Sequence, residues 1–276
     1  MHCLFCKADS SKSVSVEHII PESLWNTKHV LPRGIVCDSC NNYFARKVEK
    51  PFLDSPAIKQ LRFIEAIPNK RGRIPSASAI LMPGFPATLT ASPQSDEPIM
   101  VDVSEEAFTH IMKSSGGQFM LPMSGPEPDE SVVSRFLAKM AIEAMAHRLL
   151  SREGDIEYLT QEVQLDPLRS FARRGEPKKW PHHARRIYPA DRKIGEGDNA
   201  LQTVHEFDFL VTAHNEWYFV FALFGLELVI NMGGAEVDGY IAWLECNNGA
   251  SPLYHGRNAE NMTANPVEPW TLRNKG

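Results

Sequence analysis

Two Cys-x-x-Cys pairs near the start of the chain constrain its fold more than any other feature. Cys3 and Cys6 form the first pair, and Cys37 and Cys40 form the second. Two residues between cysteines allow both thiolates to reach one tetrahedral ion, and two such pairs complete the closed four-thiolate shell of a structural zinc site. The 30 residues between Cys6 and Cys37 are more than a compact ribbon needs. Zinc binding would therefore close a loop large enough to contain functional residues.

The segment between the cysteine pairs predicts two short strands joined by a loop. Residues 14–20 alternate in β-branched side chains and end at Pro21, a pattern typical of a strand. Turn-forming residues favour a loop over residues 21–34. We expect the second strand at residues 34–37, directly before the second cysteine pair.

A helix is predicted from Cys40 onward. Phe44, Val48 and Phe52 recur at helical spacing, and Lys and Arg occupy the other positions. We expect Pro51 to end or kink this helix, because proline lacks the backbone N–H that a helix interior requires.

These motifs in combination resemble one nuclease family. A Cys-x-x-Cys pair, the run Glu17-His18-Ile19-Ile20-Pro21, and a second pair whose Cys40 is followed by Asn41 are similar to the HNH (ββα-metal) endonucleases. Within that family they resemble the cysteine-bracketed type that includes phage endonuclease VII. The resemblance covers about residues 1–55 and does not extend to the rest of the chain.

The resemblance implies a role for each residue of the site. His18 would be the general base that takes a proton from the attacking water. Glu17 and Asn41 would offer hard oxygen ligands to a catalytic Mg²⁺ or Mn²⁺, and the four cysteines would hold structural Zn²⁺. Basic residues on the same helix would follow the flanking nucleic-acid backbone: Arg46, Lys47 and Lys50.

The sequence departs from the family pattern at two places. Glu17 stands where many members have Asp, and its longer side chain changes the position of the metal. Many members also carry a loop Asn shortly before the second cysteine pair, where this chain has residues 29–33; Asn26 is a candidate substitute. Three further polar residues near the site are interpreted as caps or surface residues: Asp38, Asn42 and Glu49.

Length and charge place limits on the rest of the protein. A chain of 276 residues that is 43% hydrophobic can bury one large core or two ordinary ones. Residues 1–74 carry 12 Lys and Arg against 7 Asp and Glu, which gives this part a net charge of +5. The whole chain has a net charge of −5, so residues 75–276 carry −10. A basic N-terminal region on an acidic body suits a local nucleic-acid site, although chance scatter of surface charge gives the same difference.

Cysteine usage and hydropathy indicate a cytoplasmic protein. Four of the 5 cysteines have metal-binding spacing, which requires thiolates kept reduced, and we interpret the fifth, Cys246, as a small buried hydrophobic residue. No run of 18 apolar residues is present, and the first metal ligand lies too close to Met1 for a signal peptide. We expect no membrane association.

The remaining residues predict a mixed body of helices and antiparallel strands. Residues 78–103 are expected to be β-rich, with a helix capped by Ser104 after them. The clearest helix is predicted from about Asp129 to Arg152, with one apolar stripe. Residues 166–193, with 9 basic and 3 acidic residues among aromatics, suit either nucleic-acid contact or a solvated linker. An antiparallel meander is expected at 207–212, 217–223, 226–231 and 240–244.

Together these observations predict an α+β protein with two parts. Residues 1–74 would form a zinc-bound, treble-clef-like HNH domain, and residues 75–276 an α+β domain that recognises substrate, partner or signal. The predicted function is hydrolysis of DNA with Mg²⁺ or Mn²⁺, leaving by family resemblance 5′-phosphate and 3′-hydroxyl ends; RNA is not excluded as a substrate. Two alternatives remain open: a non-catalytic zinc module that binds nucleic acid, and a defence effector nuclease that needs a protein partner docked on 75–276.

Overall fold

The computed structural model describes residues 1–91, 99–114, 117–122, 125, 127–197, 200–253 and 256–263. The chain divides into two compact units, Met1–Phe52 with Asp129–Ala264, and Leu53–Pro128 with Asn265–Gly276. Within the described ranges, no helix combines the length and the apolar character that a bilayer crossing requires.

The first unit begins with a β-hairpin and a helix. β1 (Glu17–His18) pairs antiparallel with β2 (Val30–Leu31), the 3-10 turn η1 (Glu22–Leu24) lies between them, and α1 (Asp38–Phe44) follows. The expected ββα order is present, but the second strand is at 30–31 and the prediction of a strand at 34–37 is wrong. Gly34 has a φ of +90°, and its carbonyl accepts a 2.6 Å hydrogen bond from the Ser10 hydroxyl. A left-handed residue turns the backbone there, so residues 34–37 cannot stay extended.

The helix that starts after Cys37 continues past Pro51. α1 leads into a π-helical turn, η2 (Ala45–Glu49), and then into α2 (Lys50–Leu53). The Lys50 N–H bonds to the carbonyl of Ala45, five residues back. Pro51 therefore comes at the start of a new α-helical turn, where a missing N–H is tolerated. It does not end the helix, and the expected alternative, a kink, stays a prediction.

A long helix, α5 (Glu130–Leu149), runs through the first unit, and Asp129 caps it by accepting a 2.8 Å hydrogen bond from the Ser131 N–H. Its apolar residues are buried as predicted, but burial is not confined to one stripe. Lys139 and Glu143, which the sequence places between the apolar positions, are fully buried as well. The helix is therefore enclosed on several sides. Three shorter elements follow it: α6 (Asp155–Gln161), η3 (Val163–Leu165) and α7 (Asp166–Arg174).

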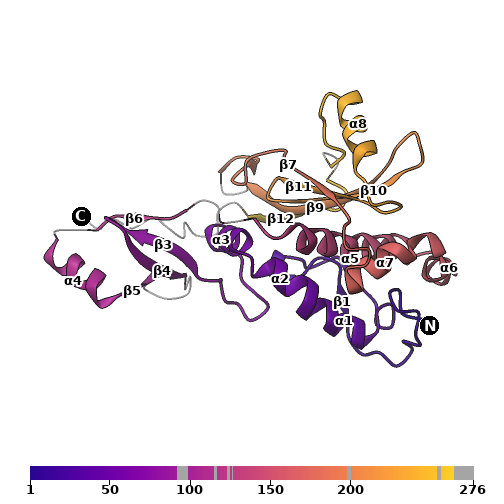
Figure 1. Cartoon of the computed structure of the whole chain (residues 1–276), viewed down its shortest axis with the longest axis horizontal. Helices are drawn as coiled ribbons and strands as arrows, with labels where there is room; N and C mark the ends of the chain where they lie inside the picture. The colour runs from indigo at the N-terminus through magenta and orange to yellow at the C-terminus, as the bar shows by residue number, and fades with distance from the viewer. Residues whose placement is uncertain are drawn as a thin grey trace. The chain divides into compact units, whose positions relative to one another are not determined.

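An antiparallel sheet completes the first unit (Figure 1). Its order is β12-β9-β10-β11-β7, and β8 also pairs with β9. The predicted meander is confirmed for its first three strands. The sheet consists of β7 (His182–Arg186), β8 (Lys193–Ile194), β9 (Leu201–Val211), β10 (Trp217–Leu223), β11 (Leu226–Asn231) and β12 (Glu260–Thr263).

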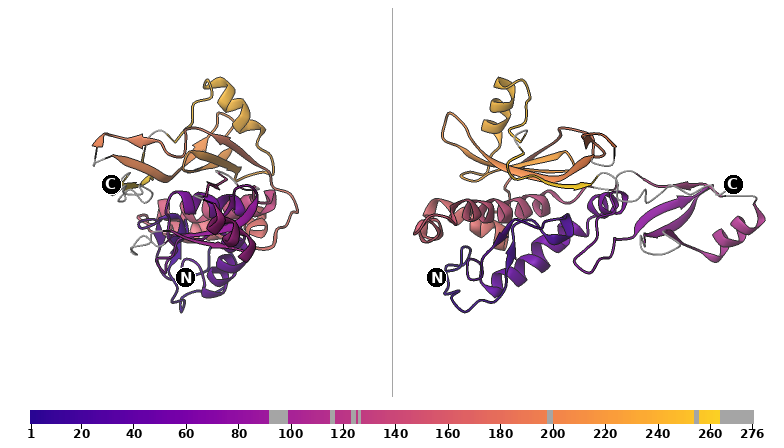
Figure 2. Two further views of the ribbon diagram at one scale, coloured as in Figure 1. Left: turned by 90° about the vertical axis from the view of Figure 1, so that its left-hand side faces the viewer. Right: turned by 180° about the vertical axis from the view of Figure 1, so that it is seen from behind.

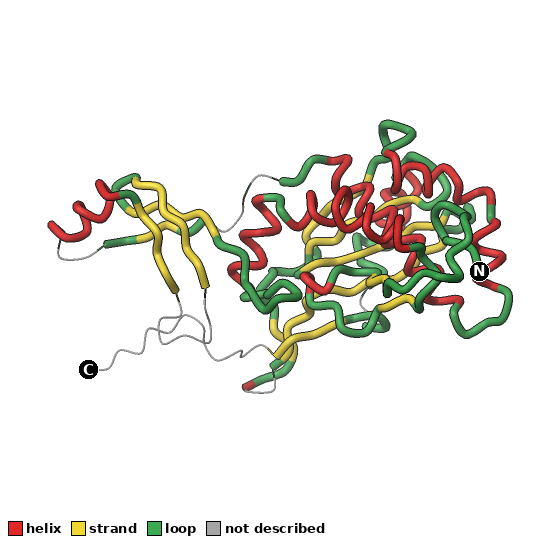
Figure 3. The backbone as a smooth tube through the Cα atoms, turned by 90° about the horizontal axis from the view of Figure 1, so that it is seen from below, coloured by secondary structure: helices red, strands yellow, loops and turns green. Residues whose placement is uncertain are grey.

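Both faces of this sheet are covered. Alternate residues of β10, such as Tyr218 and Val220, pack with Tyr240 and Leu244 of α8 (Asp238–Cys246). On the other face, Phe221 meets Phe136 of α5, edge to face at 6.5 Å between ring centroids. Figures 1 and 2 show α8 and α5 on opposite sides of the sheet, and Figure 3, seen from below, shows helices in front of its strands. Residues 240–244 were predicted as a strand; they are helical because Tyr240 and Leu244, four residues apart, are the buried pair.

The aromatic residues of segment 166–193 belong partly to the core. Phe171 of α7 and Trp180 are buried, and their rings stack at a centroid distance of 5.6 Å. The Trp180 indole N–H donates to the carbonyl of Asn231 at 2.9 Å. These two rings are therefore not available for base stacking, and the segment is not a disordered linker.

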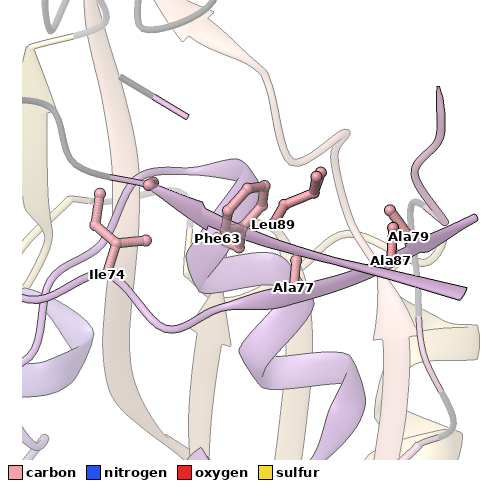
Figure 4. Close-up of a cluster of buried hydrophobic side chains, with 7 residues drawn as sticks. Phe63, Ile74, Ala77, Ala79, Ala87 and Leu89 are labelled. Atoms are coloured by element: carbon pink, nitrogen blue, oxygen red, sulfur yellow. The ribbon is translucent and has the colours of Figure 1, made fainter. Parts of the chain in front are cut away.

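In its described residues, the second unit is a small sheet with two helices. The sheet has the order β5-β4-β3-β6, and alternate residues of β3 and β4 are buried. The β-rich character of 78–103 and the cap by Ser104, whose hydroxyl accepts from the Ala107 N–H at 3.2 Å, are confirmed. Phe63 and Leu89 belong to the core cluster that Figure 4 shows. The elements are α3 (Pro56–Ile64), β3 (Ala77–Leu81), β4 (Phe85–Ala91), β5 (Ile99–Val103), α4 (Glu105–Lys113) and β6 (Phe119–Met120).

The compact units do not follow the division expected at residue 74. Residues 1–52 form one unit with 129–264 because buried polar contacts join them. Glu260 of β12 is 2% exposed, and its carboxylate accepts hydrogen bonds from the N–H groups of Thr27 and Lys28 at 3.0 and 2.8 Å. A functional division into domains 1–74 and 75–276 stays a prediction.

A buried histidine cluster joins the hairpin loop to the sheet. The ring of His29 lies 6.2 Å from that of His205 and 5.8 Å from that of His147. His205 is fully buried. Burial, with the charges of His29 and Lys28, lowers the pKa of His205 to about 3. The folded state therefore strongly favours the neutral ring.

This cluster predicts acid sensitivity of the fold. An unfolded His205 binds a proton near its ordinary pKa of 6.5, whereas the folded state binds it only near 3. Below about pH 6.5 the unfolded chain binds a proton that the folded protein does not. The free energy of unfolding is therefore unaffected by His205 above about pH 6.5 and falls as the pH is lowered, by up to about 1.4 kcal/mol per pH unit. Urea unfolding at neutral and mildly acidic pH should give a shallower pH dependence for His205→Leu than for the wild type. Equal slopes would contradict this assignment.

Candidate nuclease site

The four cysteines of the two pairs come together in one cluster. The sulfur atoms of Cys3, Cys6, Cys37 and Cys40 all lie within 4.8 Å of one another. Two backbone N–H groups point at sulfur atoms, Cys37 N–H at Cys3 Sγ (3.3 Å) and Cys40 N–H at Cys37 Sγ (3.4 Å). N–H groups directed at sulfur stabilise thiolates, which are the ligands that zinc prefers.

The electrostatics of the cluster also suit a cation. The hydrogen bond with Cys40 lowers the pKa of the Cys3 thiol to about 4, and the same bond raises the pKa of Cys40. Burial raises the pKa of Cys6. Four sulfurs this close cannot all lose their protons without a cation between them. The cluster is consistent with structural zinc.

Residues from the second half of the chain hold the first cysteine turn. Arg169 of α7 is 2% exposed, and its guanidinium donates to the carbonyl of Leu4 at 2.9 Å. Lys7 pairs with Asp166, with 2.7 Å between Nζ and a carboxylate oxygen. The zinc-binding turn is therefore supported by protein contacts in addition to the metal. Cys246, by contrast, is exposed, and the expectation that it is buried was wrong.

The loop between β1 and β2 is organised by Asn26. This residue is 3% exposed, and its amide nitrogen donates to the carbonyls of Ile20 and His29 at 2.6 and 2.9 Å. Its amide oxygen accepts from the N–H groups of Lys28 and His29 at 3.2 and 2.9 Å. Asn26 therefore satisfies four backbone groups of the loop. Asn26, the candidate substitute for the loop Asn of the family, thus anchors this loop.

The hairpin and helix bring the three predicted site residues together. Glu17 and His18 pair with β2, and the side-chain amide of Asn41 in α1 donates a 3.1 Å hydrogen bond to the carbonyl of Val16. His18 is partly exposed, with Nε2 3.4 Å from a carboxylate oxygen of Glu22. Asp38, interpreted from sequence as a cap or surface residue, accepts hydrogen bonds from the N–H groups of Val14 and Ser15, which precede β1.

Glu17 is buried and paired with a lysine from the second half of the chain. Lys139 of α5 places its ammonium group 2.7 Å from Glu17 Oε1, 2.7 Å from Glu49 Oε1 and 2.9 Å from Glu143 Oε2. The ammonium group also donates to the carbonyl of His18 at 2.8 Å. The other carboxylate oxygen of Glu17 is buried without a hydrogen-bond partner among the described residues.

Burial shifts the pKa values of this cluster. Burial raises the pKa of Glu17, against the effect of Lys139, and raises that of Glu143 well above its ordinary value. Burial alone would lower the pKa of Lys139, but the surrounding carboxylates raise it well above normal. Lys139 therefore stays charged, whereas burial favours the protonated forms of Glu17 and above all of Glu143.

Sequence reasoning missed this cluster. Glu49, interpreted as a cap or surface residue, faces Lys139, and its side chain is only 16% exposed. Lys139 and Glu143 were not singled out, although a Lys and a Glu four residues apart inside an otherwise apolar helix are a visible signal. The sequence pattern does not predict that Lys139 pairs with Glu17 as well as with Glu143.

The predicted nucleic-acid contacts lie on the surface of the same helix. Arg46 and Lys47 of η2 and Lys50 of α2 are exposed. Arg46 donates from Nε to the carbonyl of Asn42 at 3.3 Å, which directs its charge along the helix. Their contact with nucleic acid stays a prediction.

The fold and the site define a class. A four-cysteine cluster able to hold a metal ion, a hairpin bearing an acid–His pair and a helix bearing Asn41 form a ββα unit of the nuclease type. The comparison with protein families agrees: residues 3–56 match the family model described as HNH endonuclease, so this segment is an HNH endonuclease domain. Such a domain indicates a nuclease with a nucleic-acid substrate. The comparisons with curated proteins and with solved structures gave no match.

Loss of one zinc ligand should unfold the hairpin. Structural zinc contributes on the order of 10 kcal/mol to folding of small zinc units. We expect Cys37→Ser to lose zinc and to lower the unfolding temperature, measured by metal analysis and circular dichroism. Cys246→Ser is the matched control, because Cys246 is exposed and outside the cluster. Normal zinc content and stability in Cys37→Ser would refute the zinc assignment.

Asn26 should contribute measurably to stability. Asn26→Ala removes four hydrogen bonds and leaves buried backbone groups unpaired, at a cost of about 3 kcal/mol. Urea unfolding should show this loss, and Asn42→Ala, at an exposed position of α1, should show little. An equal effect of the two substitutions would disagree with the anchoring role.

Proposed function

We propose that the protein is a metal-dependent endonuclease that hydrolyses DNA phosphodiester bonds, with His18 as the general base. The observation that carries this proposal is the convergence of Glu17, His18 and Asn41 inside the segment that matches the HNH family. The hydrogen bond from Asn41 to the carbonyl of Val16 joins the helix to the residue that precedes Glu17.

His18 is suited to accept a proton. Its ring is partly exposed, so a water molecule and a phosphate can approach it. An imidazole is a base near neutral pH, and abstraction of a proton from water generates the nucleophile that attacks phosphorus in line. The neighbouring carboxylate of Glu22, 3.4 Å away, would stabilise the imidazolium that this transfer forms.

Glu17 and Asn41 would hold the catalytic cation. The buried Oε2 atom of Glu17 has no hydrogen-bond partner among the described residues, so it can coordinate a metal. The amide nitrogen of Asn41 donates to the carbonyl of Val16, which leaves its amide oxygen for the same metal. Bound Mg²⁺ or Mn²⁺ would act as a Lewis acid on the phosphate and its leaving oxygen.

The remaining parts of the proposal concern the substrate and its setting. The exposed Arg46, Lys47 and Lys50 would contact phosphates next to the cleaved bond, a contact that does not depend on base sequence. We propose that residues 75–276 select the substrate or a protein partner. A reducing, cytoplasmic setting is part of the proposal, because the four thiolates must stay unoxidised to bind zinc.

Plasmid cleavage tests the nuclease and its base together. Wild-type protein should nick supercoiled DNA with Mg²⁺ or Mn²⁺ and not with EDTA. His18→Ala should keep its fold and zinc but lose roughly 10²–10⁴-fold in rate, since it lacks the proton acceptor. His214→Ala replaces an exposed histidine outside the site and should cleave normally.

Other outcomes would redirect the interpretation. Full activity in His18→Ala would exclude His18 as the base. Absence of cleavage by folded, zinc-loaded wild-type protein on both DNA and RNA would favour a binding module or a nuclease that requires a partner. Gel-shift measurements on the same preparation separate these two, because a binding module retains nucleic acid without a partner.

A further inference from the structure

The structure assigns to Lys139 the role of positioning residue for the nuclease site. This inference rests on the proposed function and extends it, because Lys139 lies 83 residues beyond the end of the family match at residue 56. The nuclease site would then be completed by α5, and residues 3–56 alone would not hold it in its working geometry.

The contacts of Lys139 reach both members of the acid–His pair. Its ammonium group binds the side chain of Glu17 at 2.7 Å and the main-chain carbonyl of His18 at 2.8 Å. A longer contact of 3.4 Å reaches the carbonyl of Ile19. One cation therefore holds three consecutive residues of the strand that carries the base and the expected metal ligand. β1 itself has only two residues paired with β2 and offers few constraints of its own.

Lys139 is itself held in one place. Its side chain is fully buried, and Glu143, one helical turn further along α5, binds the ammonium group at 2.9 Å. Glu49 approaches at 2.7 Å from the other side. A buried ammonium group with three protons and several anionic acceptors cannot rotate away without losing these bonds. The position of Glu17 is thus coupled to the position of α5.

The π-helical turn explains how Glu49 joins this arrangement. η2 inserts one wide turn into the helix between Cys40 and Phe52. The extra residue in such a turn rotates the side chains that follow relative to a regular α-helix, and π turns occur often at functional sites. Glu49 is the last residue of η2 and points to Lys139. The ion cluster therefore connects the strand and the helix of the ββα unit through a single lysine.

Lys139 would affect catalysis by holding the site residues in position. Lys139 does not touch the reacting atoms; it acts through Glu17 and the backbone of His18. A displacement of about 1 Å in a catalytic constellation can lower the rate about 100-fold. Loss of Lys139 should thus lower kcat and leave the affinity for DNA, which depends on exposed basic residues, unchanged.

The chain offers a matched control one turn earlier on α5. Arg135 also bridges α5 to the ββα helix, donating to the Tyr43 hydroxyl at 2.9 Å and to the carbonyls of Ala172 and Arg173 at 3.1 and 2.9 Å. It has no contact with Glu17 or His18 among its hydrogen bonds in the described part of the chain. Arg135→Met therefore weakens the same packing without touching the acid–His pair.

The test compares Lys139→Met with Arg135→Met in full-length protein loaded with zinc. We expect kcat for plasmid cleavage in Mn²⁺ to fall about 100-fold in Lys139→Met with KM for DNA unchanged, whereas Arg135→Met retains kcat. Equal losses of kcat in the two variants would mean that Lys139 only stabilises the fold. Wild-type kcat in a folded Lys139→Met protein would also overturn the inference.

A second readout does not depend on activity. Hydrogen exchange measured by mass spectrometry should increase in the peptide that contains His18 and Ile19 in Lys139→Met, and not in Arg135→Met. An unchanged exchange rate there would refute positioning even if the wild type proved inactive. Failure of the proposed function, seen as an inactive wild type, is in this way distinguished from failure of the inference.

A double variant covers the case in which Lys139→Met does not fold. Lys139→Met with Glu143→Met replaces two members of the buried cluster by apolar side chains of similar length, and so leaves fewer buried carboxyl groups without a cation than Lys139→Met alone. This protein should bind zinc, show faster exchange at His18 and Ile19, and lose kcat about 100-fold. Normal exchange and normal kcat in the double variant would count against Lys139.

Discussion

The convergence of four sulfur atoms is the constraint on which the nuclease unit depends. The unit has only a two-residue strand pair, a short loop and one helix, and elements of this size cannot bury enough apolar surface to fold alone. Drawing Cys3 and Cys6 to within 4.8 Å of Cys37 and Cys40 closes the loop that contains Glu17 and His18. The cluster also places Asn41 beside that loop, because Asn41 directly follows the last cysteine.

Residues from the second half of the chain hold the ββα unit in place in addition to the four-cysteine cluster. Lys139 binds Glu17, Arg169 binds the first cysteine turn, and Glu260 binds the loop between β1 and β2. These three residues come from α5, α7 and β12, so the ββα unit rests on a scaffold that follows it in sequence. The segment between, residues 53–128, forms a compact unit of its own. The scaffold and the ββα unit are thus separated along the chain and joined by buried polar bonds.

Much of the fold followed from local pattern. The ββα order, the β-rich segment at 78–103, the long helix and three strands of the meander were predicted because periodicity and turn residues are properties of neighbouring positions. The predictions that were wrong also have identifiable physical causes. Gly34 adopts a left-handed conformation that ends extension, and residues 240–244 cover the sheet as a helix because Tyr240 and Leu244 are buried together.

The sequence by itself determined the chemistry of the site: four cysteines at zinc spacing, an acid next to a histidine, and an asparagine after the last cysteine. Adjacent residues carry that information, so the resemblance to the HNH endonucleases was enough to name Glu17, His18 and Asn41 as the expected site residues. Only the tertiary structure decided which groups surround them. Glu17 and Glu49 both bind Lys139 because α5 packs against the hairpin and against η2. Glu17 and Lys139 lie more than a hundred residues apart in the sequence, so their contact depends on tertiary packing, which local residue spacing does not predict.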